Sequence, residues 1–180
     1  MKRWLNIIPG LLLILFSCEQ DIPQEDVFDN PLDEEEVTYL TPALTLFPIL
    51  VDVSVGGSFP VEVFVLEVDN MAGAFVRLNY NKAKLQMLSI NAGQFFLDNA
   101  QDPIFITEDN SEEGWIDIHT SFLGGDSIAV SGTGSLAEIV FTSLSAGESN
   151  LTFDPACELV DPDDNLIEIK GFGLGVVNAQ

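Results

Sequence analysis

The sequence is poor in basic residues and rich in acidic ones. It contains six Lys and Arg, one His, and 29 Asp and Glu, which gives a formal net charge of −23. This balance excludes a nucleic-acid-binding protein, because such binding depends on neutralising phosphates with Lys and Arg. An acidic chain of this kind suits an extracytoplasmic protein instead.

The sequence also lacks a hydrophobic run long enough to cross a membrane. Its N-terminal apolar run, from Trp4 to Phe16, has 13 residues and follows the positive charges of Lys2 and Arg3. A bilayer core of ~30 Å needs about 20 apolar residues. A positive start followed by a short apolar run is typical of a secretory signal peptide, which is removed after export. We therefore expect residues 1–17 to be a signal peptide.

The end of this run, Leu15-Phe16-Ser17-Cys18, resembles a bacterial lipobox. The resemblance implies that Cys18 carries a diacylglycerol and, after cleavage, a further acyl chain. More than one chain gives lasting membrane attachment. The expected location is the outer membrane or cell surface, through a lipid anchor, with the membrane face left open. The alternative is an ordinary cysteine near an ordinary cleavage site.

Cysteines are too few for a disulfide framework. If Cys18 is lipidated, Cys157 is the only cysteine left, and no intramolecular disulfide can form. Next to the apolar Leu159 and Val160, Cys157 is expected to be a buried, small hydrophobic residue. The domain must therefore depend on its apolar core.

Residues 19–36 contain nine acids, no Lys or Arg, and Pro23 and Pro31. Low hydrophobicity with high net charge cannot offset the entropy of ordering, so residues 18–36 are predicted to be a lipidated N-terminus and a flexible acidic tether. Two roles stay open: a spacer repelled by an anionic membrane surface, or a surface-export signal. The remaining residues, 37–180, are enough for one ordinary domain.

Helical periodicity is absent from residues 37–180, where no apolar stretch keeps a helical spacing over three turns. Short β-rich runs recur instead, bounded by Gly, Asn, Asp and Pro, which predicts an all-β, two-sheet β-sandwich. The clearest run alternates Val61, Val63 and Val65 with a second, only partly polar face. Strands are expected near 43–54, 59–69, 73–80, 84–90, 103–107, 114–122, 127–131, 134–144, 149–153, 157–160, 166–169 and 173–178.

Two shorter segments add detail to this pattern. Residues 163–165, Asp-Asp-Asn, lie between two apolar runs and predict a hairpin turn. Residues 91–99 leave a short helix open, although Gly93 argues for caution.

The order of these segments resembles a cohesin domain, or its wider carbohydrate-binding-module superfamily. The resemblance lies in GSFPVEV at 57–63, GAFVRLNYNKAKLQMLSI at 73–90, and GSLAEIVF at 134–141 with the pieces that follow it. It spans about residues 43–178. It implies a jelly-roll-like, cohesin-type sandwich that binds a protein partner of the dockerin type without catalysis.

The resemblance also assigns positions within the domain. Tyr80 is expected at a strand end with its ring packed and its hydroxyl at a turn, before Leu85 opens the next core strand. Cohesins usually have Tyr-Asp-Pro at this turn, where this chain has Tyr-Asn-Lys. Cohesins that grip a dockerin carry polar residues where this chain has Gly73 and Phe75. The departure shifts the expected interface toward apolar contacts.

Strand alternation places Trp115, Asp117, His119 and Ser121 on one face. A hydrolase relay through the last three residues is excluded, because no strained turn precedes Ser121 and same-face neighbours lie ~7 Å apart. The face is then either a plain solvent-facing surface or a binding face made by Phe75, Trp115, Asp117 and His119. In the second case Trp115 would stack on a sugar or anchor a protein.

Calcium is the only cofactor for which the sequence offers candidates. Asp161, Asp163, Asp164 and Asn165 place hard oxygen ligands in one short segment. The segment lacks the glycine and the twelve-residue spacing of an EF-hand loop. The alternative is a solvated turn without any metal.

Three functions follow for a chain that is not expected to be an enzyme. The leading hypothesis is a non-catalytic module displayed on the cell envelope, which binds a dockerin-like protein and meets the membrane only through its lipid. The alternative is direct binding of polysaccharide, connected with polysaccharide breakdown. The third is a structural component of the envelope.

Overall fold

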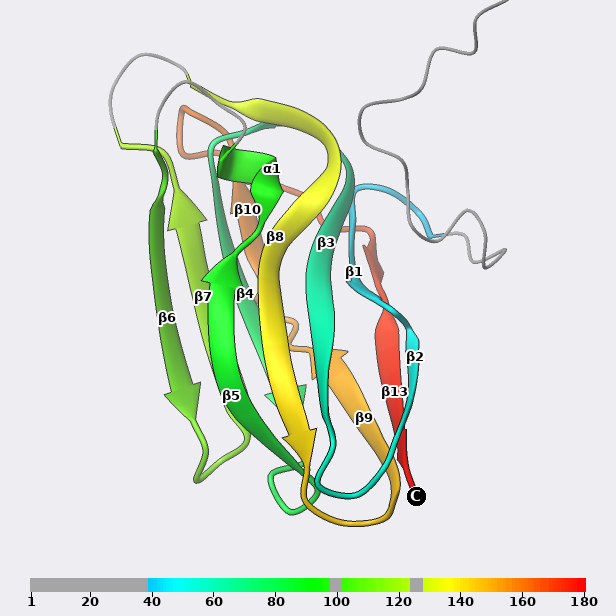
Figure 1. Ribbon diagram of the computed structural model, residues 1–180. Coiled ribbons are helices and arrows are strands. Elements are labelled where there is room, and N and C mark those ends of the chain that lie inside the picture. The colour runs from blue at the N-terminus through cyan, green and yellow to red at the C-terminus, as the bar shows by residue number, and fades with distance from the viewer. Residues whose placement is uncertain (1–38, 98–101, 124–127) are drawn as a thin grey trace, which may run out of the picture.

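Two β-sheets lie face to face in the computed structural model, which describes residues 39–97, 102–123 and 128–180 (Figure 1). The first sheet has five strands in the order β12-β1-β3-β8-β5. The second has the order β11-β10-β4-β9-β13-β2, and is extended by β7, which pairs with β4, and by β6, which pairs with β7. This arrangement confirms the predicted all-β, two-sheet sandwich.

The first sheet is formed by β1 (Ala43–Phe47), β3 (Ser58–Met71), β5 (Leu85–Ala92), β8 (Val130–Ser143) and β12 (Gly171–Phe172). The second is formed by β2 (Leu50–Val53), β4 (Gly73–Tyr80), β6 (Ile104–Asn110), β7 (Trp115–Ser121), β9 (Gly147–Phe153), β10 (Glu158–Val160), β11 (Leu166–Ile167) and β13 (Leu174–Ala179). A helical turn, α1 (Gln94–Leu97), covers one end of the sandwich (Figure 1). Among the described residues, no helix has the length and apolar character needed to cross a membrane.

The expected signal peptide, the lipidated Cys18 and the acidic tether all precede Tyr39. They lie outside the described residues and stay predictions.

The space between the sheets is filled by side chains that alternate along the long strands. Val61, Val63 and Val65 of β3 are buried as predicted, and Ile139 and Phe141 of β8 lie in the same core. The second sheet contributes Val76, Leu78, Ile116, Ile118 and Leu159. Burial of apolar surface, worth about 25 cal/mol per Å², is the main stabilising term. Cys157 is a free, buried thiol, as predicted.

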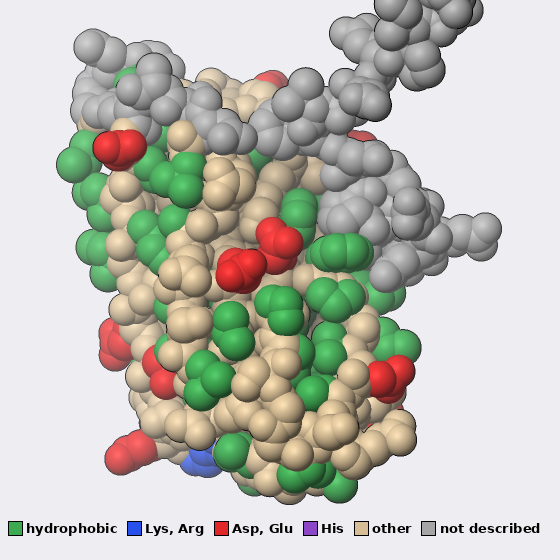
Figure 2. Space-filling view, in the orientation of Figure 1, with side chains coloured by type: hydrophobic (Ala, Val, Ile, Leu, Met, Phe, Trp, Pro, Cys, Tyr) green, Lys and Arg blue, Asp and Glu red, His purple; other side chains and the backbone are tan. Residues whose placement is uncertain are grey.

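A second, smaller apolar cluster covers part of the first sheet on its outer side. Ala43 and Leu66 are buried there, with Tyr39, Phe47 and Phe64 packed against them. Figure 2 views the molecule from the side of this sheet: acidic side chains are scattered over the face, and a basic side chain shows only at its lower edge. This agrees with the second, only partly polar face predicted for the run of Val61, Val63 and Val65.

The expected strand 43–54 is wrong, because two strands from different sheets occupy it. β1 pairs with β3, whereas β2 pairs with β13. Pro48 lies between them. Proline has no N–H to donate and a fixed φ, so it ends β1 and the chain crosses to the other sheet.

The expected division between strands 127–131 and 134–144 is also wrong, because β8 continues without a break from Val130 to Ser143. Its pairing with β3 continues through register shifts, with Val65 opposite Gly134 and Val68 opposite Gly132. Such bulges interrupt the local alternation on which the prediction depended. The hairpin at 163–165 is confirmed, since β10 pairs antiparallel with β11.

Tyr80 ends β4 with its ring in the core, as predicted. The ring centroid lies 5.5 Å from that of Phe141 in β8, and the hydroxyl donates a hydrogen bond of 2.9 Å to Oδ1 of Asp109 in β6. Burial, helped by Asp109, raises the pKa of Tyr80 to about 12. Leu85 then opens β5 in the core. Tyr80 thereby connects both sheets.

Replacing Tyr80 with Phe is expected to lower the free energy of unfolding by about 1 kcal/mol at pH 7, because the hydrogen bond to Asp109 is lost. The folded pKa of about 12 lies above the value of about 10 for an unfolded tyrosine. The stabilisation is therefore complete below about pH 10 and is lost as the pH rises through the folded pKa. Urea unfolding at neutral and at alkaline pH measures this, with Tyr39→Phe as the control. A gap between wild type and variant that stays constant up to pH 12 would contradict it.

Candidate binding face

The outer face of β10, β4, β7 and β6 brings the predicted binding residues together. Phe75 of β4 lies opposite His119 of β7 and Glu158 of β10, and His119 lies opposite Ile106 of β6. The rings of Phe75 and His119 stack with centroids 4.8 Å apart and an interplanar angle of 26°. Ile106 is 59 % exposed. One cross-strand row is thus apolar and aromatic at the surface.

A charged row runs beside this apolar row. The Arg77 side chain donates from Nε to Oδ1 and from its NH2 nitrogen to Oδ2 of Asp117, each at 2.6 Å. The hydrogen bond to Asp117 raises the pKa of Arg77, and Asp154 and Glu108 act in the same direction. Asp117 is only 6 % exposed. A bidentate pair with a buried carboxylate fixes the plane of the guanidinium.

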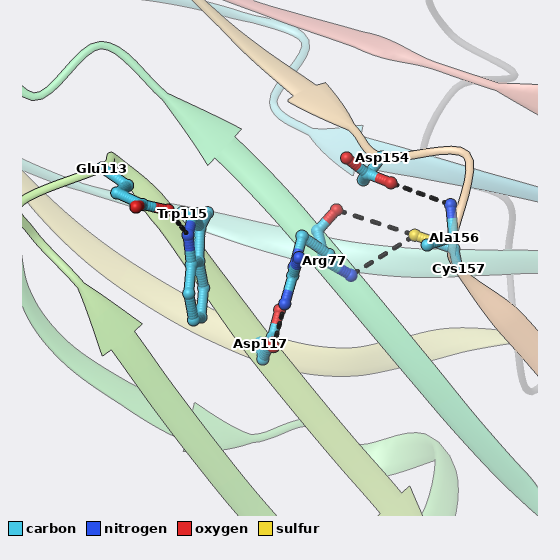
Figure 3. Close-up of polar contacts among 7 residues, drawn as sticks. All are labelled: Arg77, Glu113, Trp115, Asp117, Asp154, Ala156 and Cys157. Atoms are coloured by element: carbon cyan, nitrogen blue, oxygen red, sulfur yellow. Dashed lines mark hydrogen bonds and ion pairs between the residues drawn. The ribbon is translucent and has the colours of Figure 1, made fainter.

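Trp115 completes the face on the other side of Arg77. The guanidinium carbon lies 4.3 Å from the Trp115 ring and 6.0 Å from the centroid of Phe75, which are distances for cation–π contacts. The indole Nε1 donates to Oε2 of Glu113 at 3.0 Å (Figure 3). The structure therefore joins Phe75, Trp115, Asp117 and His119, as predicted, through an arginine between them. We call these five residues the binding face.

A shallow hollow of about 220 Å³ lies at the end of the binding face. Gly73 is one of its lining residues, and a Cβ there would come within 3.0 Å of Val160 and 3.3 Å of Ser121. Phe75 and His119 form its wall on the side of the binding face. The hollow is the size of one side chain.

The charge of this region is negative. Arg77 is the only Lys or Arg in β4, β6, β7 and β10, whereas these strands contain Glu108, Asp109, Asp117 and Glu158. Since Asp117 neutralises Arg77, no Lys or Arg of these four strands is left to balance the exposed carboxylates.

The hydrolase relay that the sequence argued against is not assembled. Both carboxylate oxygens of Asp117 bind Arg77, so Asp117 does not orient His119. The imidazole of His119 stacks on Phe75 instead. Acid–base catalysis by a triad needs the opposite arrangement, with the carboxylate on the imidazole.

The candidate calcium segment forms a self-contained turn between β10 and β11. Oδ1 of Asp161 accepts hydrogen bonds of 2.9 Å from the backbone N–H groups of Asp163 and Asn165, and Oδ2 accepts one of 3.0 Å from the Asn165 side chain. The hydrogen bond from the Asn165 side chain is the main reason why the pKa of Asp161 is lowered. Asp164 takes φ of 60° at the turn. Within the described ranges no three His, Cys, Asp or Glu side chains are grouped to hold a metal. The calcium site stays a prediction.

Sequence reasoning missed Arg77, Ile106 and Glu158 as members of this surface. Alternation alone places Arg77 on the same side as Phe75, and that pattern was available. Ile106 and Glu158 depend on which strands become neighbours, which the local pattern does not contain.

Replacing Asp117 with Asn is expected to lower the free energy of unfolding by about 1 kcal/mol, because it leaves the Arg77 guanidinium without its anion. Chemical denaturation measures the change. Glu138→Gln, an exposed carboxylate of β8 in the first sheet, is the matched control and should stay near wild type. An equal loss of unfolding free energy in Asp117→Asn and Glu138→Gln would refute the assignment of Asp117 as the stabilising partner of Arg77.

Comparison with known proteins agrees with the β-sandwich fold. Residues 49–171 match the family model of the cohesin domain. No curated protein matches the chain. Among solved structures, a non-cellulosomal cohesin from the hyperthermophilic archaeon Archaeoglobus fulgidus is similar at 19 % identity and a TM-score of 0.61, over 77 % of this chain and 91 % of that one.

Two further solved structures match this chain with comparable sequence identity and TM-score. A type II cohesin domain from the cellulosome of Acetivibrio cellulolyticus is 18 % identical, with a TM-score of 0.64 over 76 % of this chain and 93 % of that one. A type I cohesin–dockerin complex from Clostridium thermocellum matches at 14 % identity and a TM-score of 0.63, over 81 % and 99 %. At these identities the structures show a shared fold, and the family is shown by the match of residues 49–171. The chain belongs to the cohesin domain family.

Proposed function

We propose that this chain is a non-catalytic protein-binding module and that its partner docks on the binding face. The observation that carries the proposal is the stack of Trp115, Arg77, Phe75 and His119 on the outside of the second sheet. Interfaces derive most of their energy from a few aromatic and arginine residues with fixed positions. Here those residues are already held in place without a partner.

A dockerin-type protein is the partner that this face fits best. The similar Clostridium thermocellum structure is a cohesin bound to a dockerin. Because this chain has Gly73 and Phe75 where dockerin-binding cohesins carry polar residues, and because Ile106 is exposed on the same face, the contact would be more apolar than the family pattern implies. The hollow at Gly73 would take one anchoring side chain of the partner.

A protein fits better than a sugar for a specific reason. Carbohydrate binding needs an open aromatic face on which a sugar ring stacks. The Arg77 guanidinium lies over the Trp115 ring at 4.3 Å, so one face of this indole is occupied. The negative strands around Arg77 favour a partner whose apolar contact is bordered by Lys or Arg, since complementary charge increases the association rate and specificity.

The position of Tyr39, where the described residues begin, supports display of the binding face toward the surroundings. Tyr39 packs with Ala43 and Leu66 on the outer side of the first sheet, whereas the binding face lies on the outer side of the second. The described chain therefore begins on the side of the sandwich opposite the binding face. This agrees with a lipid anchor at Cys18 and an extracytoplasmic location, outer membrane or cell surface.

Replacing Phe75 with Ala is expected to reduce partner binding at least tenfold, because loss of an aromatic hot spot costs about 1–4 kcal/mol. The full chain, immobilised, is exposed to purified dockerin modules and to secreted proteins of the same cell, and binding is measured by surface plasmon resonance.

Leu88→Ala is the matched control for this experiment. Leu88 is a 52 % exposed apolar residue of β5, in the other sheet. Binding that is equally sensitive to both substitutions, or insensitive to both, would refute the binding face. Failure of every protein probe together with retention on polysaccharide gels would favour the carbohydrate alternative.

Replacing Cys18 with Ser is expected to release the protein from membranes, because attachment by acyl chains is lost. Metabolic labelling with a palmitate analogue and fractionation measure this, with Cys157→Ser as the control that keeps the label. A Cys18→Ser protein that still carries lipid would contradict the anchor.

A further inference from the structure

The central strand of the binding face has a break in its backbone pairing. Residues 78–80 of β4 pair with β9, and residues 73–75 pair with β10. Between β9 and β10 the chain turns out of the ladder: the Cys157 N–H donates to the Asp154 carbonyl at 3.1 Å, and the Ala156 N–H donates to Asp154 Oδ1 at 2.9 Å. Opposite this turn stands Arg77.

A side chain replaces the missing strand at this break. The Arg77 N–H donates to Sγ of Cys157 at 3.3 Å, and the Cys157 thiol donates to the Arg77 carbonyl at 3.6 Å (Figure 3). The Asp154 N–H adds a hydrogen bond of 2.9 Å to the same carbonyl. Burial raises the pKa of Cys157 to about 11. The thiol therefore stays protonated at neutral pH and is able to donate.

The direction of these hydrogen bonds determines how close the side chains of Arg77 and Asp117 lie across the two strands. Because the N–H and carbonyl of Arg77 point toward Cys157, they do not bond to β7, and Arg77 and Asp117 form a non-hydrogen-bonded antiparallel pair. Side chains of such pairs lie closer together than those of hydrogen-bonded pairs. The backbone contact with the thiol thus supports the short bidentate contact of the guanidinium.

We propose that Cys157 is a positioning residue of the binding face: its thiol completes the ladder of β4 at Arg77 and so holds the guanidinium on Asp117 and over Trp115. This inference rests on the proposed function only because it calls the surface a binding face. Its test uses the free protein, so its outcome does not depend on whether a binding partner is found.

The test measures the environment of Trp115 in the free protein. In the full chain with Trp4→Phe, Trp115 is the only tryptophan. Cys157→Val keeps the side chain apolar and removes both hydrogen bonds, whereas Cys157→Ser keeps a donor and an acceptor. Cys157→Ala serves if the valine variant does not fold. Acrylamide quenching of fluorescence and the indole N–H resonance are recorded well below the unfolding temperature.

We expect Cys157→Val to raise the quenching constant by about twofold, because the guanidinium no longer covers one ring face, and Cys157→Ser to stay near wild type. Val177→Ala, a buried β13 substitution away from Arg77, controls for loss of stability alone. Unchanged quenching in Cys157→Val, an equal rise in the serine variant, or an equal rise in Val177→Ala would each overturn the proposal.

Discussion

The pairing of β3 with β8 is the interaction on which the rest of the structure depends. Both strands are long and lie side by side in the middle of the first sheet. They supply the valines and the Phe141 ring against which the second sheet packs. Because Phe141 contacts Tyr80, the position of β4 follows from this pairing. In the described part of the chain the sole cysteine is a free thiol, so apolar burial must hold the two sheets together.

The binding face adds an electrostatic constraint to this packing. Among the strands of the described residues, Arg77 is the one Lys or Arg, and it lies at the centre of the second sheet in an ion pair with the buried carboxylate of Asp117. Removing either charge from the pair leaves the other partly desolvated, which costs more than the pair itself contributes. The pair is therefore better understood as a means of fixing geometry than as a source of stability. A surface arranged in advance loses less entropy when a partner binds.

Local alternation predicted much of the fold, and contacts distant in sequence limited the rest. Val61, Val63 and Val65, and the face from Trp115 to His119, follow from a period of two that the chain keeps without interruption. The break at Pro48 had a local signal in the proline itself, but the continuity of β8 through Gly132 depends on which strand lies alongside, and no local pattern states that. The same limit hid the contact between Arg77 and Cys157: 80 residues separate them, and the contact comes from the register of β4 with its neighbours. The stacking of His119 on Phe75 likewise required the register.

Tyr39 packs beside Ala43, the first residue of β1, and this position determines where a pulling force would enter the domain. A force applied between the N-terminal end of the described chain and a protein held on the binding face must pass along β1. That strand pairs through hydrogen bonds, antiparallel with β3 over its whole length and parallel with β12 at Ala43 and Leu44. Tension along a strand loads such bonds in shear, so several of them must break together before the strand slides. The pulling force thus enters the domain through β1, which has a paired strand on each side in the first sheet, whereas the bound protein would sit on the second sheet.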